Sequence, residues 1–303
     1  MNPARLIALD WGTSNLRASL LGDGGQVLQT RAGASGVMAV PQGRFAVALL
    51  ELCGDWIAQH ACPLIASGMV GSRQGWHEVP YLECPATLAQ AARQMARVEV
   101  KPQVVLHIVP GLCCVGSDGQ DDVMRGEETQ IWGAGLDDGS CVVLPGTHSK
   151  WAWTGAGAVI SGFATYMTGE LYALLTQHGI LGRLMSFGED DAEAFARGVQ
   201  LGLADPANIM HSVFAARTAG LMQRMAPTAL PDFLSGMLIG AEIAGASARL
   251  RPDHVTLIGD TALNARYAAA LKIAGIHASP LSADATTRGQ WQLALQAGLL
   301  ENR

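Results

Sequence analysis

A pattern of three short apolar segments joined by tight bends occurs twice in this chain, and it constrains the fold more than any other feature. The first copy occupies residues 6–11, 16–21 and 26–32, and the second occupies residues 141–144, 151–153 and 158–163. Short apolar segments separated by glycine-containing bends are typical of neighbouring β-strands. The sequence therefore predicts two similar three-stranded units within 303 residues, a length that allows two domains with cores of their own.

The first bend of each copy contains a Gly-Thr pair, Gly12-Thr13 in one and Gly146-Thr147 in the other. Glycine allows the backbone to approach a ligand closely, and the N–H groups of such a bend can face an anion. One bend of this kind is ordinary turn chemistry, but two in corresponding places indicate that the chain grips a polyphosphate from both sides. No Walker motif occurs in the sequence, so this prediction depends on the repeat. Asp10, next to the first bend, would hold the accompanying Mg²⁺ through water, because Mg²⁺ dehydrates reluctantly.

Helical and strand-like segments alternate after each copy of the repeat. Strands are expected at residues 63–69, 104–109 and 255–258, and helices at residues 45–56, 88–95, 125–133, 190–200, 206–225, 233–250, 263–274 and 291–299, with a further helix from Thr168. This alternation predicts an α/β protein whose mixed sheets are covered by helices. We expect two ribonuclease-H-like domains that face a central cleft, residues 1–133 with the first bend and residues 134–280 with the second. Residues 281–303 would form a C-terminal helix that could pack back on the first domain.

Composition argues against several classes of protein. The formal net charge is −6 and no basic run occurs, so we expect no nucleic-acid-binding surface. The six cysteines lack metal-ligand spacing, which favours a reduced, cytoplasmic protein, and no signal peptide precedes Asp10. The most membrane-like stretch, residues 233–250, contains Glu242 and many small residues, so it is predicted to be a packed core helix and not a membrane span. The role of Glu242 stays open, with a place in the lining of a pocket as one alternative.

Several motifs resemble those of the sugar kinase, hexokinase, Hsc70 and actin superfamily. Residues 10–17 resemble its first phosphate motif, residues 145–147 the second, and residues 257–262 the adenosine motif. At closer range the chain resembles the 2-dehydro-3-deoxygalactonokinase family nearly from end to end. The motifs that carry this resemblance are residues 68–76 (GMVGSRQGW), 124–130 (MRGEETQ), 144–151 (LPGTHSKW) and 167–171 (MTGEL).

The family resemblance implies a phosphotransferase that uses ATP and Mg²⁺ to phosphorylate the C6 hydroxyl of 2-dehydro-3-deoxy-D-galactonate in galactonate catabolism. The partner would be a small keto-deoxy sugar acid, with no nucleic acid and no membrane, and a homodimer is a reasonable expectation. The gluconate-derived epimer, 2-dehydro-3-deoxygluconate, is the nearest alternative substrate, because one stereocentre cannot be read from sequence. A sugar-binding regulator on the same fold is a weaker alternative, since such regulators carry a DNA-binding module before the first phosphate strand.

The resemblance also implies which residues bind the nucleotide. The phosphates would meet Gly12, Thr13, Ser14 and Arg17 from the first bend and Gly146, Thr147 and Lys150 from the second, while Gly259, Asp260 and Asn264 would lie near the adenosine. Arg17 and Lys150 could instead be solvated, and Asp260 could cap the helix that follows it. His148 is expected to be an ordinary turn residue.

Arg73, Gln74 and Trp76 follow a predicted strand and are the candidates for binding the sugar acid. Strand ends are where sites in α/β folds lie. A keto-deoxy acid needs a partner for its carboxylate, and the planar fork of an arginine suits that role. Gln74 could add a hydrogen bond and Trp76 an apolar wall. The alternative is an arginine whose stem lies along the surface of a loop.

Glu127 and Glu128 are the candidates for the general base, which would accept the proton of the substrate hydroxyl. They are adjacent at a predicted helix start, so only one of them is expected to face the substrate. Related sugar kinases place an Asp before Thr, Asn or Gln here, which favours Glu128-Thr129 and leaves Glu127 as the alternative. Glutamate in place of aspartate departs from that pattern. Acidic residues are also favoured in a first helical turn for electrostatic reasons alone.

Overall fold

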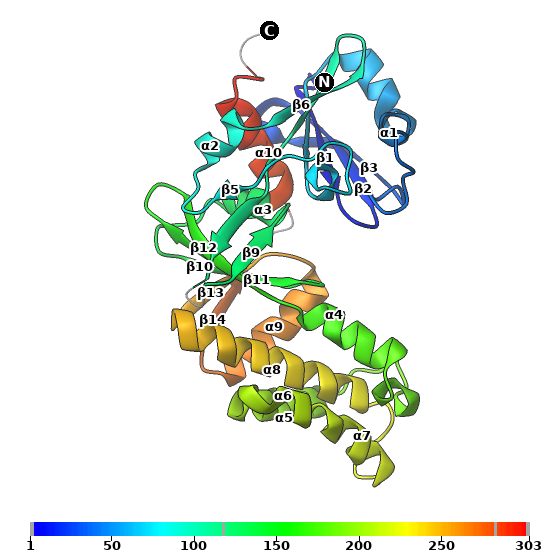
Figure 1. Cartoon of the computed structure of the whole chain (residues 1–303), viewed down its shortest axis with the longest axis vertical. Coiled ribbons are helices and arrows are strands. Elements are labelled where there is room, and N and C mark those ends of the chain that lie inside the picture. The colour runs from blue at the N-terminus through cyan, green and yellow to red at the C-terminus, as the bar shows by residue number, and fades with distance from the viewer. Residues whose placement is uncertain (1–2, 117–118, 282–283, 301–303) are drawn as a thin grey trace. The chain divides into compact units, whose positions relative to one another are not determined.

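The computed structural model describes residues 3–116, 119–281 and 284–300, and the chain divides into two compact units (Figure 1). Unit 1 comprises residues 1–139, 153–163 and 282–303, and unit 2 comprises residues 140–152 and 164–281. The chain therefore returns to unit 1 twice, first for part of a hairpin and then for its last helix.

Unit 1 is built on a six-stranded mixed sheet with the strand order β3-β2-β1-β4-β7-β6. Its strands are β1 (Leu6–Trp11), β2 (Leu16–Leu21), β3 (Val27–Gly33), β4 (Leu64–Ser67), β6 (Ala96–Lys101) and β7 (Val104–Ile108). The first three strands are antiparallel neighbours, whereas β4 runs parallel to β1 and β7 runs parallel to β4. The register places Arg17 and Ser67 beside Asp10 on either side. Three polar residues from separate strands therefore meet near the carboxyl end of β1.

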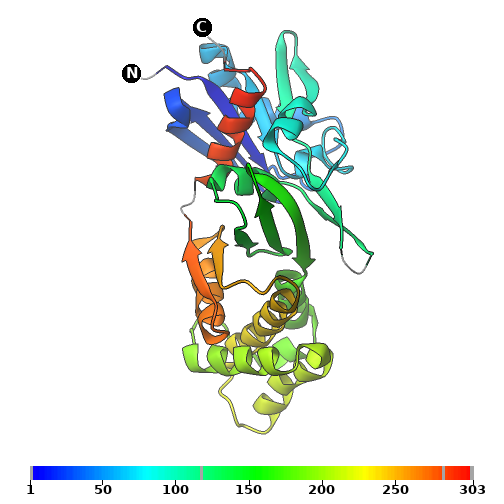
Figure 2. The same ribbon diagram turned by 90° about the vertical axis from the view of Figure 1, so that its left-hand side faces the viewer.

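Helices cover both faces of this sheet. The apolar stripe of α1 (Phe45–His60) packs into the same core as Leu9 of β1. The opposite face carries α10 (Ala285–Gln296), the red helix in Figure 2, whose Gln290 reaches the carbonyl oxygen of Leu9. Since β1 is covered on both faces, Asp10 is its only residue that is not fully buried, as is typical of a central strand in an α/β sheet.

Two helices and a smaller sheet complete unit 1. The helices are α2 (Leu88–Arg93) and α3 (Glu127–Ala134), and the sheet has the order β5-β8-β9 with β5 (Leu82–Glu83), β8 (Leu112–Val115) and β9 (Asp121–Met124). The predicted helices at 88–95 and 125–133 are confirmed, but the first ends two residues early, so that β6 follows almost at once. The sequence analysis missed β5, β6, β8 and β9. β5, β8 and β9 have only two to four residues and form a small sheet of their own. β6 alternates Val98 and Val100 with charged residues, a pattern that the sequence analysis overlooked.

Unit 2 contains most of a five-stranded sheet with the order β12-β11-β10-β13-β14. Residues 153–163 of this sheet, at the end of β11 and the start of β12, belong to unit 1. Its strands are β10 (Cys141–Leu144), β11 (Ser149–Gly155), β12 (Val159–Tyr166), β13 (His254–Leu257) and β14 (His277–Pro280). β10 runs parallel to β13, and β13 runs parallel to β14. The two large sheets thus share one order. The three strands of a repeat lie side by side, and the first of them is followed by two further parallel strands, β4 and β7 in one sheet and β13 and β14 in the other. The predicted duplication of a three-stranded unit is confirmed.

The helices of unit 2 are α4 (Thr168–Ala173), α5 (Ala192–Ala204), α6 (Ile209–Ser212), α7 (Phe214–Leu221), α8 (Leu230–Leu250) and α9 (Thr261–Ile273). α8 is the small-residue helix expected at 233–250. It approaches α5 so closely that a Cβ atom on Gly236 would lie 2.2 Å from the carbonyl oxygen of Phe195. The small residues therefore serve packing between helices. Within the described ranges, no helix combines the length and the apolarity that crossing a membrane would require.

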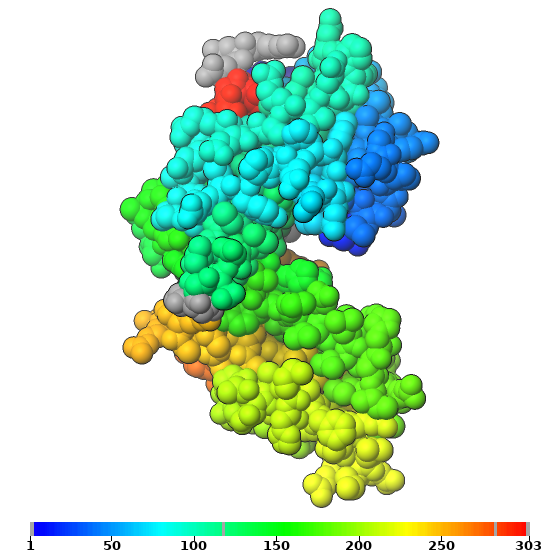
Figure 3. Space-filling view, viewed as in Figure 1, coloured from blue at the N-terminus to red at the C-terminus, as the bar shows by residue number. Residues whose placement is uncertain are grey.

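The helix expected over residues 206–225 is broken into three pieces, a 3-10 turn at Pro206–Asn208 followed by α6 and α7. Met210 and Phe214, which lie one helical turn apart, are 84% and 50% exposed. These apolar side chains therefore form no buried stripe that would stabilise one straight helix against the core. Figure 3 shows this yellow-green segment on the surface of unit 2.

The C-terminal helix is present as α10, but it runs over Ala285–Gln296 and not over the predicted residues 291–299. Leu295 is 52% exposed. The buried face instead carries small residues, a glutamine and one leucine: Ala285, Gly289, Gln290, Leu293 and Ala294. Close helix packing selects small residues, which a search for large apolar residues does not detect.

Candidate active site

The first Gly-Thr bend presents free backbone donors. The carbonyl oxygens of Gly12, Thr13 and Ser14 accept hydrogen bonds of 3.0–3.2 Å from the N–H groups of residues 36–38. These bonds fix the bend from one side. Among the described residues, the N–H groups of Thr13 and Ser14 have no acceptor, and both residues are exposed. The bend therefore keeps donors for an anion, as its sequence predicted.

Asp10 lies beside this bend, next to a small cavity of about 230 Å³ that Arg17, Thr287 and Gln290 also line. No hydrogen bond reaches its carboxylate from the described part of the chain. Burial raises the pKa of the Asp10 carboxyl above its ordinary value, and the charge of Arg17 partly offsets this effect. Arg17 itself is exposed, so both expectations for it, a solvated strand residue and a charged neighbour of the bend, agree with its position.

Two glycines bring Asp10 close to the start of α3. Gly68 follows β4 with φ +93°, and a Cβ atom there would lie 2.8 Å from the carbonyl oxygen of Trp11. Gly126 precedes α3 with φ +111°, and its Cβ atom would lie 3.3 Å from the Cα of Gly68. Both backbone conformations favour glycine. As a result, the ends of β1 and β4 and the first turn of α3 converge at one place in unit 1.

Glu127 and Glu128 both fold back on the backbone before α3. An oxygen of Glu127 accepts a hydrogen bond of 3.0 Å from the N–H of Arg125, and one of Glu128 accepts a bond of 2.6 Å from Gly126. The second oxygen of Glu128 accepts a bond of 2.8 Å from the hydroxyl of Thr129. Glu128 is 0% exposed, whereas Glu127 is partly exposed. Burial, and then the charge of Glu127, raise the pKa of Glu128 to about 7.

Exposure therefore separates the two carboxylates. A general base must come within hydrogen-bond reach of the hydroxyl it deprotonates. In this structure the Glu127 carboxylate is partly exposed, whereas Glu128, which the sequence register favoured, offers no accessible oxygen.

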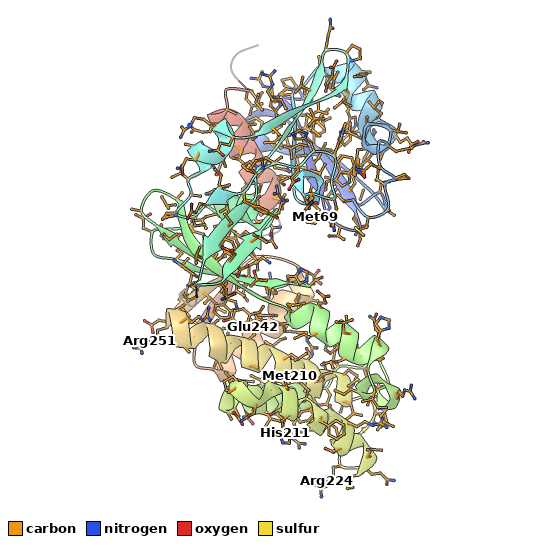
Figure 4. The ribbon with its side chains drawn as sticks, viewed as in Figure 1. Met69, Met210, His211, Arg224, Glu242 and Arg251 are labelled. Carbon is orange, nitrogen blue, oxygen red and sulfur yellow. The ribbon has the colours of Figure 1, made fainter. Side chains whose placement is uncertain are left out.

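The expected substrate residues lie on one loop but differ in their surroundings. Met69–Gly71 forms a 3-10 turn directly after Gly68, and Figure 4 labels Met69 there. Arg73 and Gln74 follow this turn and are exposed. Trp76 packs into the core instead, with its ring stacked on Phe45 at a centroid distance of 6.1 Å. Its indole therefore packs between the loop and the core, and less of its apolar surface is accessible to a substrate than expected.

The second Gly-Thr bend lines a much larger cavity, about 750 Å³ in volume, that lies wholly within unit 2. The carbonyl oxygen of Thr147 accepts a hydrogen bond of 2.9 Å from the N–H of Glu170, and the side chain of Glu170 bonds His148 at 2.5 Å. His148 is thus a turn residue with a defined partner on α4. In the described chain, the N–H groups of Gly146 and Thr147 have no acceptor, as in the first bend.

Residues of α8 and α9 form the opposite walls of this cavity. They are Asp232, Ser235, Leu238 and Ile239 from α8, and Leu263, Arg266 and Tyr267 from α9. Asp232 and Arg266 form an ion pair of 2.5 Å. The cavity is mainly apolar, with backbone donors at Gly146 and Thr147. Its charged side chains are the Asp232–Arg266 pair and the carboxylates of Glu189, Asp190 and Asp260. This combination suits a nucleotide, whose base is apolar and whose phosphates are anionic.

The remaining nucleotide candidates support the cavity more than they line it. Asp260 caps α9, since its carboxylate accepts bonds from the N–H groups of Ala262 and Leu263, and it also reaches the cavity. Asn264 is buried and donates a bond of 3.2 Å to the carbonyl oxygen of Gly259. Lys150 is 4% exposed, so the alternative of a solvated lysine is wrong.

Glu242, left open by the sequence, is the centre of a buried polar cluster. Figure 4 labels it on α8. Its carboxylate accepts hydrogen bonds of 2.8 Å from the hydroxyl of Ser149, 2.8 Å from the indole N–H of Trp151 and 2.6 Å from the hydroxyl of Tyr267. Burial raises the pKa of Glu242, and hydrogen bonds from Thr168 and from these three side chains oppose the shift. Of the partners, Tyr267 lines the large cavity and Ser149 starts the strand after the second bend. A single acidic residue in an apolar helix indicated that Glu242 has a buried polar environment. The side chains that donate hydrogen bonds to it could not be identified from the sequence.

Comparison with known proteins shows the family to which the chain is similar. The model of the 2-keto-3-deoxy-galactonokinase family matches residues 10–293. The 2-dehydro-3-deoxygalactonokinase of Escherichia coli strain K12 is 38% identical over 283 residues, which are 93% of this chain and 94% of that protein. A crystal structure of a Sinorhizobium meliloti protein, provisionally described as a 2-dehydro-3-deoxygalactonokinase, superposes with a TM-score of 0.85 at 35% identity. That match covers 98% of this chain and 100% of the other.

A more distant structure shows the fold alone. The activator of the 2-hydroxyisocaproyl-CoA dehydratase from Clostridium difficile, solved with bound ADPNP, has a TM-score of 0.51 at 10% identity, over 98% of this chain and 94% of that one. Together with the duplicated strand order, this similarity confirms the predicted α/β fold of two ribonuclease-H-like domains of the actin-like ATPase type. By the extent of these matches, the chain belongs to the 2-keto-3-deoxy-galactonokinase family.

Proposed function

We propose that this protein transfers the γ-phosphoryl group of ATP to the C6 hydroxyl of 2-dehydro-3-deoxy-D-galactonate, as a step of galactonate catabolism. The observation that carries the proposal is the 38% identity, across nearly the full length of both chains, to the Escherichia coli protein of that name. The geometry of the two bends, of Asp10 and of the start of α3 supports it.

The nucleotide binds in the large cavity of unit 2. Its volume of about 750 Å³ lies within the ~300–1,000 Å³ that is usual for sites of small ligands. The adenosine lies between α8 and α9, and the phosphates extend toward the free N–H groups of Gly146 and Thr147. Asp260 holds the start of α9 in place, and Asn264 holds the turn at Gly259.

Asp10 holds the Mg²⁺ that accompanies the phosphates. In the part of the chain that the structure describes, no group of three acidic, histidine or cysteine side chains gathers to form a metal site. One carboxylate with free oxygens fits Mg²⁺, which usually takes one or two carboxylates and completes its shell with water and substrate phosphates. When bound, Mg²⁺ neutralises charge on the transferred group. Thr13, Ser14 and Arg17 contribute donors and a positive charge beside Asp10.

The sugar acid binds in unit 1, along the loop that follows β4. Arg73 pairs with its carboxylate and Gln74 adds a hydrogen bond, because both side chains are exposed on that loop. Glu127 accepts the C6 hydroxyl proton as the oxygen attacks phosphorus, since its carboxylate is the accessible one at the start of α3. Glu128 is the alternative base.

The proposal is tested by measuring ATP consumption with purified protein across keto-deoxy sugar acids and neutral sugars. We expect turnover with 2-dehydro-3-deoxygalactonate and a product that carries phosphate on C6, with little turnover of neutral hexoses. A clear preference for 2-dehydro-3-deoxygluconate would correct the stereochemistry of the substrate. Absence of any phosphorylated keto acid would contradict the proposed function.

A further inference from the structure

Gln290 of α10 lies at the centre of unit 1, and neither the sequence motifs nor the relatives assign it a role. Its side chain is 1% exposed. The amide nitrogen donates a hydrogen bond of 2.7 Å to the carbonyl oxygen of Leu9 and one of 2.9 Å to the hydroxyl of Ser67. Leu9 directly precedes Asp10, and Ser67 pairs with Asp10 across the sheet. One amide group therefore joins the two strand ends next to the Asp10 carboxylate.

The residue before Gln290 connects the same helix to α3. A Cβ atom on Gly289 would lie 1.9 Å from the carbonyl oxygen of Thr129, and one on Gly133 would lie 1.9 Å from that of Ala285. The backbones of α10 and α3 therefore touch, as Figure 1 shows for these two helices. Thr129 immediately follows Glu128, so the contact with Gly289 lies at the first turn of α3.

We propose that Gln290 is a positioning residue for phosphoryl transfer, which sets the separation between the Asp10 carboxylate and the carboxylates at the start of α3. The inference rests on the proposed function. Phosphoryl transfer depends mainly on the placement of charged groups, and a misplacement of about 1 Å can cost about a hundredfold in rate. The path from Asp10 to Glu128 runs along the chain to Leu9, through its hydrogen bond to Gln290, and through the contact of Gly289 with Thr129, all within unit 1.

A neutral amide is the group that this position needs. It donates to a carbonyl and a hydroxyl oxygen at once, whereas a carboxylate could donate to neither. The charged groups around the cavity beside Gln290 are Asp10, Arg17 and Asp284. A carboxylate here would add a third negative charge beside Asp10 and Asp284, while a cation would compete with Mg²⁺ for Asp10.

The inference is tested by Gln290→Met and Gln290→Glu, with Gln296→Met as the control on the exposed end of α10. The unaltered protein is assayed first, since absence of phosphoryl transfer there would contradict the proposed function itself. We expect Gln290→Met to lower kcat by about 10- to 100-fold, with KM for ATP and for the sugar acid changed less than threefold. Gln290→Glu should also move the acidic limb of the kcat profile to higher pH, which loss of packing alone would not do. Gln296→Met should behave as the unaltered protein.

Two outcomes overturn the inference. The first is a folded Gln290→Met protein with kcat within threefold of normal. The second outcome concerns Ser67→Ala, which is the variant to use if Gln290→Met does not fold. Ser67→Ala removes one hydrogen-bond acceptor of the Gln290 amide and leaves almost no cavity. A folded Ser67→Ala protein with unchanged kcat and pH profile would show that the contact does not position Asp10.

Discussion

Glu127 and Glu128 have the same side chain and adjacent positions, yet the structure gives them different chemistry. Successive helical residues point about 100° apart, so Glu128 turns into the interior of unit 1 while Glu127 stays partly exposed. Sequence register could suggest which residue is the base, but it could not detect burial. At the scale of single residues, the type of side chain was predictable and its access to the substrate was not.

The paired variants Glu127→Gln and Glu128→Gln identify the base. We expect Glu127→Gln to lower kcat by about 10²- to 10⁴-fold, the usual contribution of a general base, with little change in KM. Glu128→Gln should lower kcat less than tenfold, because its oxygens are enclosed. Each variant is the control of the other in steady-state kinetics. The reverse pattern would assign the base to Glu128, and a small effect of both would place the base outside this turn.

Glu128 should also make stability depend on pH. Its pKa is about 7 in the folded protein against an ordinary 4.5, so the folded state binds the proton more tightly than the unfolded state does. The free energy of unfolding should therefore fall as pH rises from about 4.5 to 7, by a contribution of about 3 kcal/mol, and level off above. Urea unfolding of Glu128→Gln across this range should lack that fall. Parallel pH curves for the variant and the unaltered protein would contradict this assignment.

Arg73 should affect the sugar acid and not the nucleotide. Loss of a hydrogen bond to a charged group costs about 1.5–3 kcal/mol, so Arg73→Ala should lower kcat/KM for the sugar acid roughly tenfold to a hundredfold. KM for ATP should stay within about twofold. Arg93→Ala, which removes an exposed arginine at the end of α2, serves as the control. Equal losses for both substrates would show that Arg73 acts on the phosphates or on folding.

At the scale of elements, α8 illustrates how a helix can serve packing and a site at once. Its small residues allow close contact with α5, while Glu242 gathers donors from β11 and α9. Leu238 and Ile239, one turn earlier, line the nucleotide cavity. The cluster around Glu242 therefore fixes the strand after the second bend and one wall of the cavity with the same carboxylate.

Glu242→Gln should weaken nucleotide binding and stability together. The amide keeps the shape but replaces one acceptor oxygen with a donor group, while four side chains, Thr168, Tyr267, Trp151 and Ser149, donate to the carboxylate. Its buried donors therefore lose a partner at a cost of about 1–3 kcal/mol. We expect a lower thermal midpoint and a several-fold higher KM for ATP, with KM for the sugar acid unchanged. Glu193→Gln, at an exposed position of α5, is the matched control. Normal stability and normal ATP affinity would show that the cluster tolerates an amide.

Elements also differ in how well the sequence predicts them. The strands of both repeats and long helices such as α1 and α8 are confirmed, because buried apolar residues recur along them with a regular period. β5 and β9 are too short to show a period, and β14 is largely exposed. The buried face of α10 could not be predicted from the sequence, because glycine and glutamine, not large apolar residues, make its contacts.

At the scale of the whole molecule, the duplication was the most predictable property, and the site was predictable only in parts. Each bend could be recognised from its Gly-Thr pair, and each is found with free donors in its own unit. Gln290 could not be connected with Asp10 from the sequence, because 280 positions separate them and only the return of the chain to unit 1 brings them together. Local motifs therefore indicate which ligand a site binds, while contacts between residues far apart in sequence determine how the side chains of the site are positioned.

The two units should respond to different ligands, and amide hydrogen exchange measures this directly. A ligand stabilises the segments that it contacts, by about 2.7 kcal/mol at a concentration of 100 times its Kd, and this slows local opening there. ADP with Mg²⁺ should therefore slow exchange at residues 230–239 and 260–267, which line the cavity of unit 2. 2-Dehydro-3-deoxygalactonate should slow exchange at residues 68–76 and 126–130 of unit 1, and Arg73→Ala should remove only this second effect. Protection of α8 and α9 by the sugar acid alone would instead assign the large cavity to the substrate, and the nucleotide would need another site.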